Sequence, residues 1–258
     1  MSLRDFSLDF FNLTGKVAIV TGGNTGLGQG YAVALAKAGA DLFIVSYDTN
    51  WDETRELIEE TGRKVYFHQA DLTVRESLQP IVDTCLSVYG RIDVLVNNAG
   101  TIRRSPLLEY KEEDWDAVME INLNAVYLLS QAVAKVMVEQ KSGKIINICS
   151  MLSFQGGKFV PPYTASKHAI AGITKSFANE LAQYNVQINA IAPGYVATAN
   201  TAPIRADEER SADILSRIPA GRWATPADYM GVVVFLASQA SDYMNGHVLA
   251  VDGGWLVR

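Results

Sequence analysis

The sequence predicts an α/β protein: a doubly wound parallel sheet of about seven strands with helices on both faces. Short apolar runs alternate with longer amphipathic segments along the chain, which is the order that successive β-α-β units require. Several apolar runs are continuous rather than alternating, as expected for strands that are covered by helices on both sides. No repeat, low-complexity tract or linker-like shift divides residues 1–258, so one domain is the simplest prediction.

Each apolar run bounded by turn residues predicts a strand, and each longer amphipathic segment predicts a helix. In chain order, the strands are expected at residues 16–20, 41–46, 65–69, 92–96, 144–149, 186–192 and 248–251. The helices between them are expected at residues 26–38, 52–61, 74–89, 111–140, 162–183 and 226–237. One connection, about residues 194–223, is much longer than the others. Long ordered insertions in compact domains are often lids or substrate loops, so we expect a substrate loop there.

Composition excludes several classes of function. The chain has 22 basic and 28 acidic residues and a net charge of −6, which argues against binding to nucleic acid or to an anionic membrane. No apolar stretch is expected to reach the ~18 residues of a membrane span. Residues 1–13 lack the features of a signal peptide. Cys85 and Cys149 lie in apolar runs, as reduced, buried thiols would, and the histidines are too isolated to suggest a metal site. We therefore expect a cytoplasmic protein without a metal.

Tyr163 and Lys167 are the pair that most clearly predicts chemistry. Their i, i+4 spacing places a phenol and an ammonium on one face of a helix, and Ser150 lies thirteen residues before Tyr163. A nearby cation lowers the pKa of a phenol, and a phenol with a lowered pKa can exchange a proton with a carbonyl or an alcohol. Pairs with this spacing are common on ordinary helices, so the prediction depends on the rest of the chain.

Two further segments predict a dinucleotide site. Thr21 to Gly28 form a glycine-rich turn between a predicted strand and helix, where backbone N–H groups can approach a pyrophosphate. Asn97-Asn98-Ala99-Gly100 follows the fourth strand, at the sheet edge where ligands bind in open α/β sheets. Asp71 follows the third strand and either accepts from an adenine amino group or begins a helix. Asn122 interrupts a long helical stretch, where its side chain is expected to relieve a kink.

Together these residues resemble the short-chain dehydrogenase/reductase family over nearly the whole chain. The family's T-G-x-x-x-G-x-G loop, its N-N-A-G segment and its P-G turn stand here as Thr21 to Gly28, Asn97 to Gly100 and Pro193-Gly194. The resemblance implies a Rossmann-type fold and a catalytic tetrad in which Tyr163 is the general acid/base, Lys167 lowers its pKa and holds the nicotinamide ribose, Ser150 orients the substrate oxygen and Asn122 supports a proton relay. The implied cofactor-binding residues are Gly22, Asn24, Thr25, Gly26, Leu27, Gly28, Ser46, Asp48, Asp71, Leu72, Asn98, Ala99, Gly100, Tyr163, Lys167, Pro193, Gly194, Val196 and Thr198.

The sequence favours NAD(H) over NADP(H). Relatives that choose NAD usually end the second strand with an acid that accepts from the ribose 2′-hydroxyl. This chain departs from that pattern, because the position is Ser46, followed by Tyr47 and Asp48. Residues 46–48 and 22–28 contain no lysine or arginine to pair with a 2′-phosphate. Asp48 would repel that phosphate if it faced inward, although Asp is also common in solvated turns.

The segment Ser150 to Gly157 and the ending Val251-Asp252-Gly253-Gly254-Trp255 resemble the 2-deoxy-D-gluconate 3-dehydrogenases, also described as 2-dehydro-3-deoxy-D-gluconate 5-dehydrogenases of pectin and uronate breakdown. The resemblance implies NAD-linked chemistry on a keto-deoxy sugar acid. A guanidinium suits the carboxylate of such a substrate. We expect Arg104 to bind it, with Arg205 as second candidate, and Arg103, Arg210, Arg217 and Arg222 as others. Ser150, Tyr163 and Gln155 are the further candidate substrate contacts.

Other functions stay open on the same scaffold. A 3-oxoacyl thioester reductase, a polyol or steroid dehydrogenase and a dinucleotide-binding sensor without catalysis are the alternatives, since fold does not fix substrate. The acidic net charge argues against docking of an acyl carrier protein, and the intact tetrad argues against a sensor. The resemblance also implies a homotetramer assembled through residues 111–140, 162–183 and the end of the chain from residue 248.

Overall fold

The computed structural model describes residues 6–258; residues 1–5, the start of the segment expected not to be a signal peptide, lie outside the described residues. Seven parallel strands form one sheet in the order β3-β2-β1-β4-β5-β6-β7, which confirms the predicted fold class. The strands are β1 Val17–Thr21, β2 Asp41–Ser46, β3 Val65–Gln69, β4 Val94–Asn97, β5 Gly143–Ile148, β6 Val186–Pro193 and β7 Val248–Val251. The helices are α1 Gly26–Lys37, α2 Asp52–Glu59, α3 Leu78–Tyr89, α4 Glu112–Met119, α5 Ala125–Gln140, α6 Pro161–Leu181, α7 Ala202–Ala206, α8 Glu208–Arg217 and α9 Met230–Ala237.

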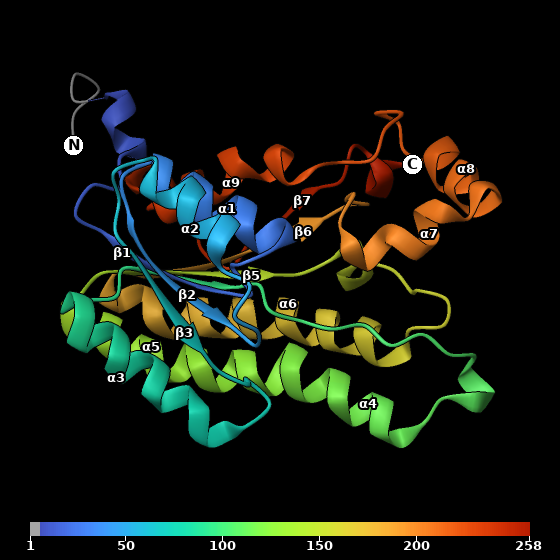
Figure 1. Cartoon of the computed structure of the whole chain (residues 1–258), viewed down its shortest axis with the longest axis horizontal. Coiled ribbons are helices and arrows are strands. Elements are labelled where there is room, and N and C mark those ends of the chain that lie inside the picture. Colours follow the sequence, from blue (N-terminus) through green and yellow to red (C-terminus); the bar gives the residue numbers. More distant parts are fainter. Residues whose placement is uncertain (1–5) are drawn as a thin grey trace.

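Helices cover both faces of the sheet (Figure 1). Helices α1, α2 and α9 lie on one face, and α3, α4, α5 and α6 lie on the other. Alternate residues of β1 serve the two layers: Val20 packs in the cluster with Tyr31 of α1 and Val233 of α9, while Ile19 packs in the cluster with Leu129 of α5. All residues of β1, β5 and β6 are buried, which explains why these strands are mostly apolar. Their polar side chains are hydrogen-bonded within the protein, as at Asn147 and Asn189.

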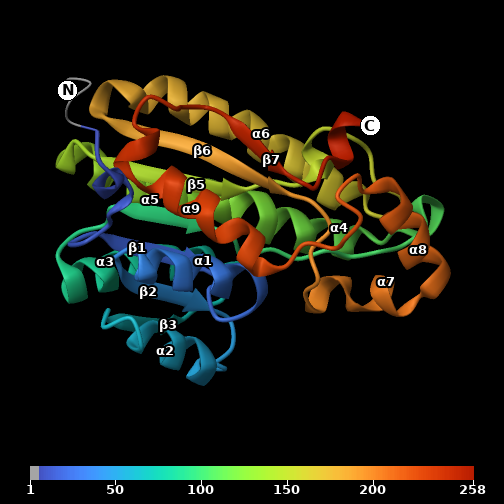
Figure 2. The ribbon, with the colours of Figure 1, turned by 90° about the horizontal axis from the view of Figure 1, so that it is seen from above.

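The predicted helices differ from the observed ones by a few residues at several ends, for example at the start of α3 (78 rather than 74) and of α9 (230 rather than 226), and more substantially in two places. The expected single helix over residues 111–140 is divided by a π-helix, Glu120–Asn124, between α4 and α5. The long connection after β6 contains two helices, α7 and α8, that the sequence did not predict. In Figure 2 these helices form a separate unit at one end of the sheet. Cys85 and Cys149 are both buried and unpaired, as expected.

The expectation about membrane spans needs a correction. Within the described residues, Glu112–Gln140 is long and apolar enough to cross a membrane by length and composition alone. The prediction missed it because the segment owes its hydropathy to an average over many alanines and valines rather than to an unbroken apolar run. Its apolar window is 44% buried, and α5 packs against α3 and the sheet while α4 packs against α6. The segment therefore has the environment of a core helix.

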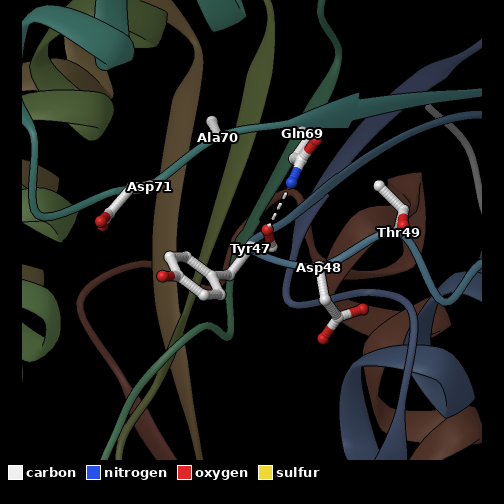
Figure 3. Close-up of a pocket in the computed structure, with 6 residues that line it drawn as sticks. All are labelled: Tyr47, Asp48, Thr49, Gln69, Ala70 and Asp71. Atoms are coloured by element: carbon white, nitrogen blue, oxygen red, sulfur yellow. Dashed lines mark hydrogen bonds between the residues drawn. The ribbon is translucent and has the colours of Figure 1, made fainter.

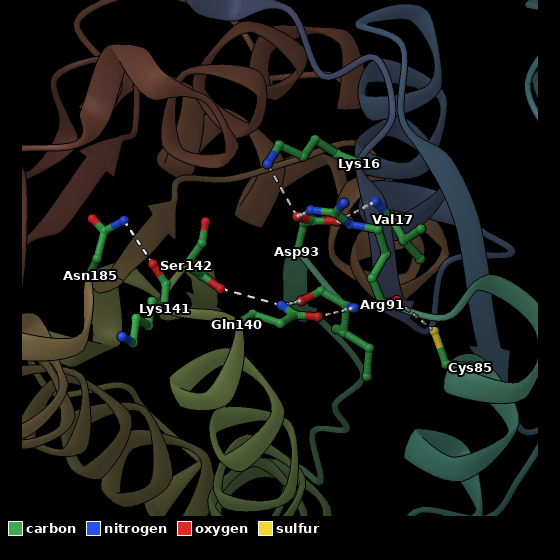
Figure 4. A network of polar contacts seen from close by, with 10 residues as sticks. Lys16, Val17, Cys85, Arg91, Asp93, Gln140, Lys141, Ser142 and Asn185 are labelled. Atoms are coloured by element: carbon green, nitrogen blue, oxygen red, sulfur yellow. Dashed lines mark hydrogen bonds and ion pairs between the residues drawn. The ribbon is translucent and has the colours of Figure 1, made fainter.

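A polar network joins the segments that precede four strands, β1, β4, β5 and β6, at the amino ends of those strands (Figure 4). The buried Asp93 carboxylate accepts from the guanidinium of Arg91 (2.7 and 2.6 Å), from Lys16 Nζ (3.2 Å) and from the backbone N–H of Val17 (3.0 Å). These contacts hold the pKa of Asp93 below its usual value, although burial alone would raise it. Nearby, the Gln140 side chain donates to Ile92 O (2.7 Å) and accepts from Ile92 N (3.1 Å). Side-chain hydrogen bonds and ion pairs thus hold the amino ends of these strands together. Ligands of open α/β sheets bind at the opposite, carboxyl ends.

Candidate active site

The glycine turn has the shape of an anion cradle. Gly22 and Gly26 have φ of 61° and 57°, a conformation that only glycine adopts freely. A Cβ at Gly28 would lie 1.9 Å from Gly22 O, so the backbone approaches too closely for any side chain there. Thr25 precedes α1 without a side-chain cap, which leaves N–H groups of the first turn available to a ligand. These features fit a dinucleotide pyrophosphate. Leu27, also expected at this site, packs against the core.

The segment after β4 holds this turn in place. Asn98 Nδ2 donates to Thr21 O (2.9 Å) and Gly22 O (3.1 Å), and Ala99 N donates to Thr21 Oγ1 (3.0 Å). The Asn98 amide is therefore engaged with the protein. What this segment can offer a ligand is the backbone of residues 98–100, which borders the glycine turn.

A pocket of about 580 Å³ lies at the carboxyl ends of β2 and β3 (Figure 3). Asp48 Oδ1 accepts from Asn24 Nδ2 (2.8 Å), which ties the pocket to the glycine turn. On the other side, Asp71 Oδ1 accepts from Thr73 N (2.9 Å). The six lining residues, Tyr47, Asp48, Thr49, Gln69, Ala70 and Asp71, include two carboxylates and no cation. The pocket therefore presents negative charge to whatever enters it.

The two other residues expected at this pocket, Ser46 and Leu72, are buried and contact the protein instead of the pocket. Ser46 is buried, donates to Asp48 O (2.7 Å) and accepts from Trp51 Nε1 (2.7 Å), so its hydroxyl is fully engaged. Leu72 is buried in the hydrophobic cluster between the sheet and helices α3 and α5. Of the residues at the end of β2, Asp48 rather than Ser46 exposes a group that a ribose could meet.

Asn122 lies in the π-helix, where the wider turn directs its side chain inward. It is 1% exposed; its Oδ1 accepts from Thr101 N (2.8 Å), and its Nδ2 donates to Thr101 O (2.9 Å) and Ser166 Oγ (3.3 Å). Ser166 in turn donates to Tyr163 O (2.8 Å). The helix is interrupted at Asn122 by a π-turn, and Asn122 joins the segment after β4 to the turn of α6 that carries Tyr163.

Tyr163 and Lys167 lie one turn apart on α6, as their spacing predicts, with Lys167 Nζ 5.6 Å from the centre of the Tyr163 ring. Lys167 is 6% exposed and donates to Ile148 O (2.6 Å), and burial lowers its pKa to about 8. Burial raises the pKa of Tyr163, and the Ser150 hydroxyl and the Arg104 charge only partly oppose that rise. The net shift is opposite to the expected lowering by Lys167, because desolvation of the phenolate outweighs the nearby charges.

The segment after β6 reaches the glycine turn. A Cβ at Gly26 would lie 3.7 Å from the Thr198 methyl group, so Thr198 faces that turn. Gly194 N donates to Val251 O (3.0 Å), which fixes the Pro193-Gly194 turn against β7. Val196 is buried and bridges to Ala224. Of the expected cofactor residues of this segment, Thr198 therefore lies against the glycine turn that follows β1.

The structure separates the six candidate arginines. Arg103 pairs with Asp114 (3.6 Å), Arg222 pairs with Asp228 (2.9 and 2.5 Å), and Arg205 donates to Thr198 O (3.1 Å). Three others remain, Arg104, Arg210 and Arg217; among the described residues, Arg104 makes no hydrogen bond or ion pair. It is also the arginine whose charge acts on the Tyr163 phenol. Gln155, the remaining substrate candidate, is partly buried in the loop after Ser150.

Sequence reasoning missed an aromatic cluster beside the tetrad. Tyr195 contacts Trp223 and Trp255, with ring centres 5.4 and 4.9 Å apart. These rings pack with Met151, next to Ser150, and with the isoleucines of α7 and α8. The position of Tyr195 directly after the Pro193-Gly194 turn was the available signal, but its partners lie too far along the chain to be paired with it from sequence.

With this geometry in place, comparison with known proteins identifies the class of enzyme. Residues 16–209 match the family model of the short chain dehydrogenases. The chain belongs to this family and is an oxidoreductase that acts on CH–OH groups with a nicotinamide dinucleotide.

Individual relatives resemble the chain over nearly its full length. The 2-dehydro-3-deoxy-D-gluconate 5-dehydrogenase of Escherichia coli is 54% identical over 97% of this chain and 99% of the relative. A protein of Agrobacterium tumefaciens solved with bound NADP has a TM-score of 0.91 and 47% identity, covering 96% of this chain and 99% of that one. A gluconate 5-dehydrogenase of Burkholderia cenocepacia, solved with NADP and tartrate, has a TM-score of 0.94 and 37% identity, covering 98% and 100%.

Proposed function

We propose that this enzyme transfers hydride between NAD(H) and a keto-deoxy sugar acid of the 2-dehydro-3-deoxy-D-gluconate or 2-deoxy-D-gluconate type. The observation that carries the proposal is Arg104, which follows the segment at the carboxyl end of β4 and has no hydrogen-bond or ion-pair partner among the described residues. A substrate that binds there needs a carboxylate close to its reacting carbon. The high identity to a 2-dehydro-3-deoxy-D-gluconate 5-dehydrogenase supports the same substrate class.

In the proposed mechanism Tyr163 exchanges the proton with the substrate oxygen, and Ser150 holds that oxygen. Lys167, buried one turn along α6, supplies positive charge beside the phenol. Asn122 fixes the backbone of Thr101 and, through Ser166, the turn that carries Tyr163. The nicotinamide, when bound, supplies or accepts the hydride. The protein contributes geometry and the proton.

We further propose how the chain binds the dinucleotide. The turn Gly22 to Gly28 and the segments 98–100 and 193–198 would hold the phosphates and the nicotinamide end, and Asp48 and Asp71 would face the adenosine. A preference for NAD(H) is supported by the two carboxylates of the pocket in Figure 3 and by its lack of a cation among the lining residues, since a 2′-phosphate would be repelled there. Structural relatives hold NADP, so this preference requires a direct test.

The insertion of residues 194–223 is proposed as the substrate loop of a single catalytic domain. Arg104 is the proposed carboxylate ligand, with Gln155 beside the reacting end. Arg205 becomes less suited to that role, because it donates to Thr198 O and braces the loop instead. We also propose that the enzyme is a cytoplasmic homotetramer; the exposed aromatic side chains of α4 and α5, Trp115 and Tyr127, support an assembled form.

The proposed substrate and cofactor can be tested in one assay. We expect 3-deoxy-2,5-diketo-hexonate to be reduced with a kcat/KM for NADH at least about tenfold above that for NADPH, because one repulsive contact of about 1.4 kcal/mol gives that factor. Initial rates of NADH and NADPH oxidation in the same buffer measure both values. Equal or better use of NADPH would overturn the cofactor preference, and no turnover with either, despite tight dinucleotide binding, would overturn the sugar acid.

The pH dependence should have opposite signs in the two directions. Burial lowers the pKa of Lys167 to about 8, so the Tyr163–Lys167 pair holds its full set of protons below that pH and loses one above it. Reduction takes a proton from the pair and oxidation returns one. We therefore expect kcat/KM for reduction to fall, and kcat/KM for oxidation to rise, as pH increases through this pKa. Initial rates in both directions from about pH 6 to about pH 10 test this; parallel changes would contradict it.

A further inference from the structure

Tyr195 stands on a backbone that is fixed on both sides. Its carbonyl accepts from Ala224 N (2.9 Å), and the preceding Gly194 N donates to Val251 O (3.0 Å). The backbone at Gly194 also lies close to the residue after β7, since a Cβ at Gly194 would be 2.6 Å from Asp252 Cα. The residue therefore projects its side chain from a rigid point at the carboxyl end of β6.

The Tyr195 ring is held as firmly as its backbone. It meets Trp223 and Trp255 edge to face, with ring centres 5.4 and 4.9 Å away. Trp255 is itself 5% exposed, and the Arg217 guanidinium lies 4.1 Å from the centre of its ring. Among the described residues, the Tyr195 hydroxyl has no hydrogen-bond partner, so an oriented phenol presents a free donor.

Packing places Tyr195 close to the catalytic residues, because its ring lies in the cluster with Met151, which directly follows Ser150. Arg104 acts on both Tyr163 and Tyr195, and burial, opposed by Arg210, Arg217 and Arg104, raises the pKa of Tyr195. The three strands β4, β5 and β6, whose carboxyl ends lead to Arg104, Ser150 and Tyr195, are neighbours in the sheet. Tyr195 is thus a neutral hydroxyl donor at the same end of the sheet as Arg104, the arginine proposed to bind the substrate carboxylate.

We infer that Tyr195 is a substrate-binding residue, whose hydroxyl donates to the same carboxylate that Arg104 binds. The inference rests on the proposed function only for the identity of the sugar acid. The contact between the hydroxyl and a carboxylate does not depend on which hydroxy or keto acid is bound. A guanidinium and a phenol together can satisfy both oxygens of one carboxylate. The ring packing makes the donor rigid, so little conformational entropy is lost when the substrate binds.

The test compares Tyr195→Phe with wild type, because phenylalanine keeps the packing against both tryptophans and removes only the hydroxyl. The probe is tartrate, a hydroxy acid that a relative binds together with NADP, titrated by calorimetry into protein saturated with NADH. We expect the Kd for tartrate, and the KM for the sugar acid, to rise about tenfold, which is the usual loss for one hydrogen bond to a charged group. The value of kcat, the Kd for NADH and Tm should stay unchanged.

Tyr243→Phe is the matched control, since Tyr243 is fully exposed (106%) on the segment before β7 and should alter none of these values. Equal tartrate affinity in Tyr195→Phe and wild type would overturn the inference, as would a wild type that binds no tartrate. If wild type binds tartrate, Tyr195→Phe weakens that binding, and the diketo acid is not reduced, the inference stands and the proposed substrate fails.

Discussion

Replacing Tyr163 by phenylalanine is expected to lower kcat about 10²- to 10⁴-fold, the range for loss of a general acid or base. The ring keeps its place one turn from Lys167, 5.6 Å from Nζ, so only the exchangeable proton is removed. Affinity for the dinucleotide and Tm should therefore stay close to wild type. Steady-state rates, a dinucleotide titration and a melting curve measure the three quantities.

Two outcomes would contradict this role. A variant that retains most of its kcat would show that another group supplies the proton. A variant that loses dinucleotide binding and Tm together would show that the hydroxyl is structural. The Tyr243→Phe protein serves as control here too, because the Tyr243 side chain is fully exposed.

Replacing Gly28 by alanine is expected to weaken dinucleotide binding about tenfold or more. The added Cβ would lie 1.9 Å from Gly22 O and 2.5 Å from Asn98 Nδ2, and neither can retreat, since Asn98 Nδ2 donates to both Thr21 O and Gly22 O. Overpacking of this kind costs about 1–3 kcal/mol, and each 1.4 kcal/mol taken from binding is about a factor of ten. A fluorescence titration with NADH and a denaturant titration divide the cost between affinity and stability.

Gly231→Ala is the matched control for this substitution. A Cβ at Gly231, exposed near the start of α9, would meet nothing within 4 Å. Alanine is favoured over glycine in a helix by about 0.5–1 kcal/mol, so this variant should bind NADH normally and be slightly more stable. If Gly28→Ala behaves in the same way, the close approach within the glycine turn has no functional importance.

The sheet could be predicted from sequence because its information is local. The buried strands are continuous apolar runs, and the glycine turn and the Tyr163–Lys167 pair each lie within one short segment. Helix α7 was missed because it has only five residues, and α8 was missed because it buries a single side chain, Ile214, and so has little apolar periodicity to predict it. Asp207, which caps α8 by accepting from Arg210 N (3.0 Å), was the local signal for the second of them.

What sequence could not provide was the choice among equivalent residues. The sequence does not show which of the six candidate arginines are already paired within the protein, as Arg103 is with Asp114. The direction of the Tyr163 pKa shift also depended on burial, which outweighs the nearby charges and has no local signature in the sequence. Ion pairing and burial are both properties of the folded chain. The sequence could therefore locate the candidate site, but not the unpaired arginine or the direction of the Tyr163 pKa shift.

The π-helix at Glu120–Asn124 has a consequence for how this chain can change over evolution. A π-turn holds one more residue than an α-helical turn, so the segment is equivalent to a single insertion into a continuous helix. Loss of one residue there would restore regular winding and leave α4 and α5 able to form. Because the π-turn accommodates its extra residue locally, the residues on either side would keep nearly the same orientation, and only the residues within the turn would change direction. Asn122 would then no longer reach Thr101 and Ser166. The extra residue of the π-turn and the position of the Asn122 amide can therefore be kept or lost only together.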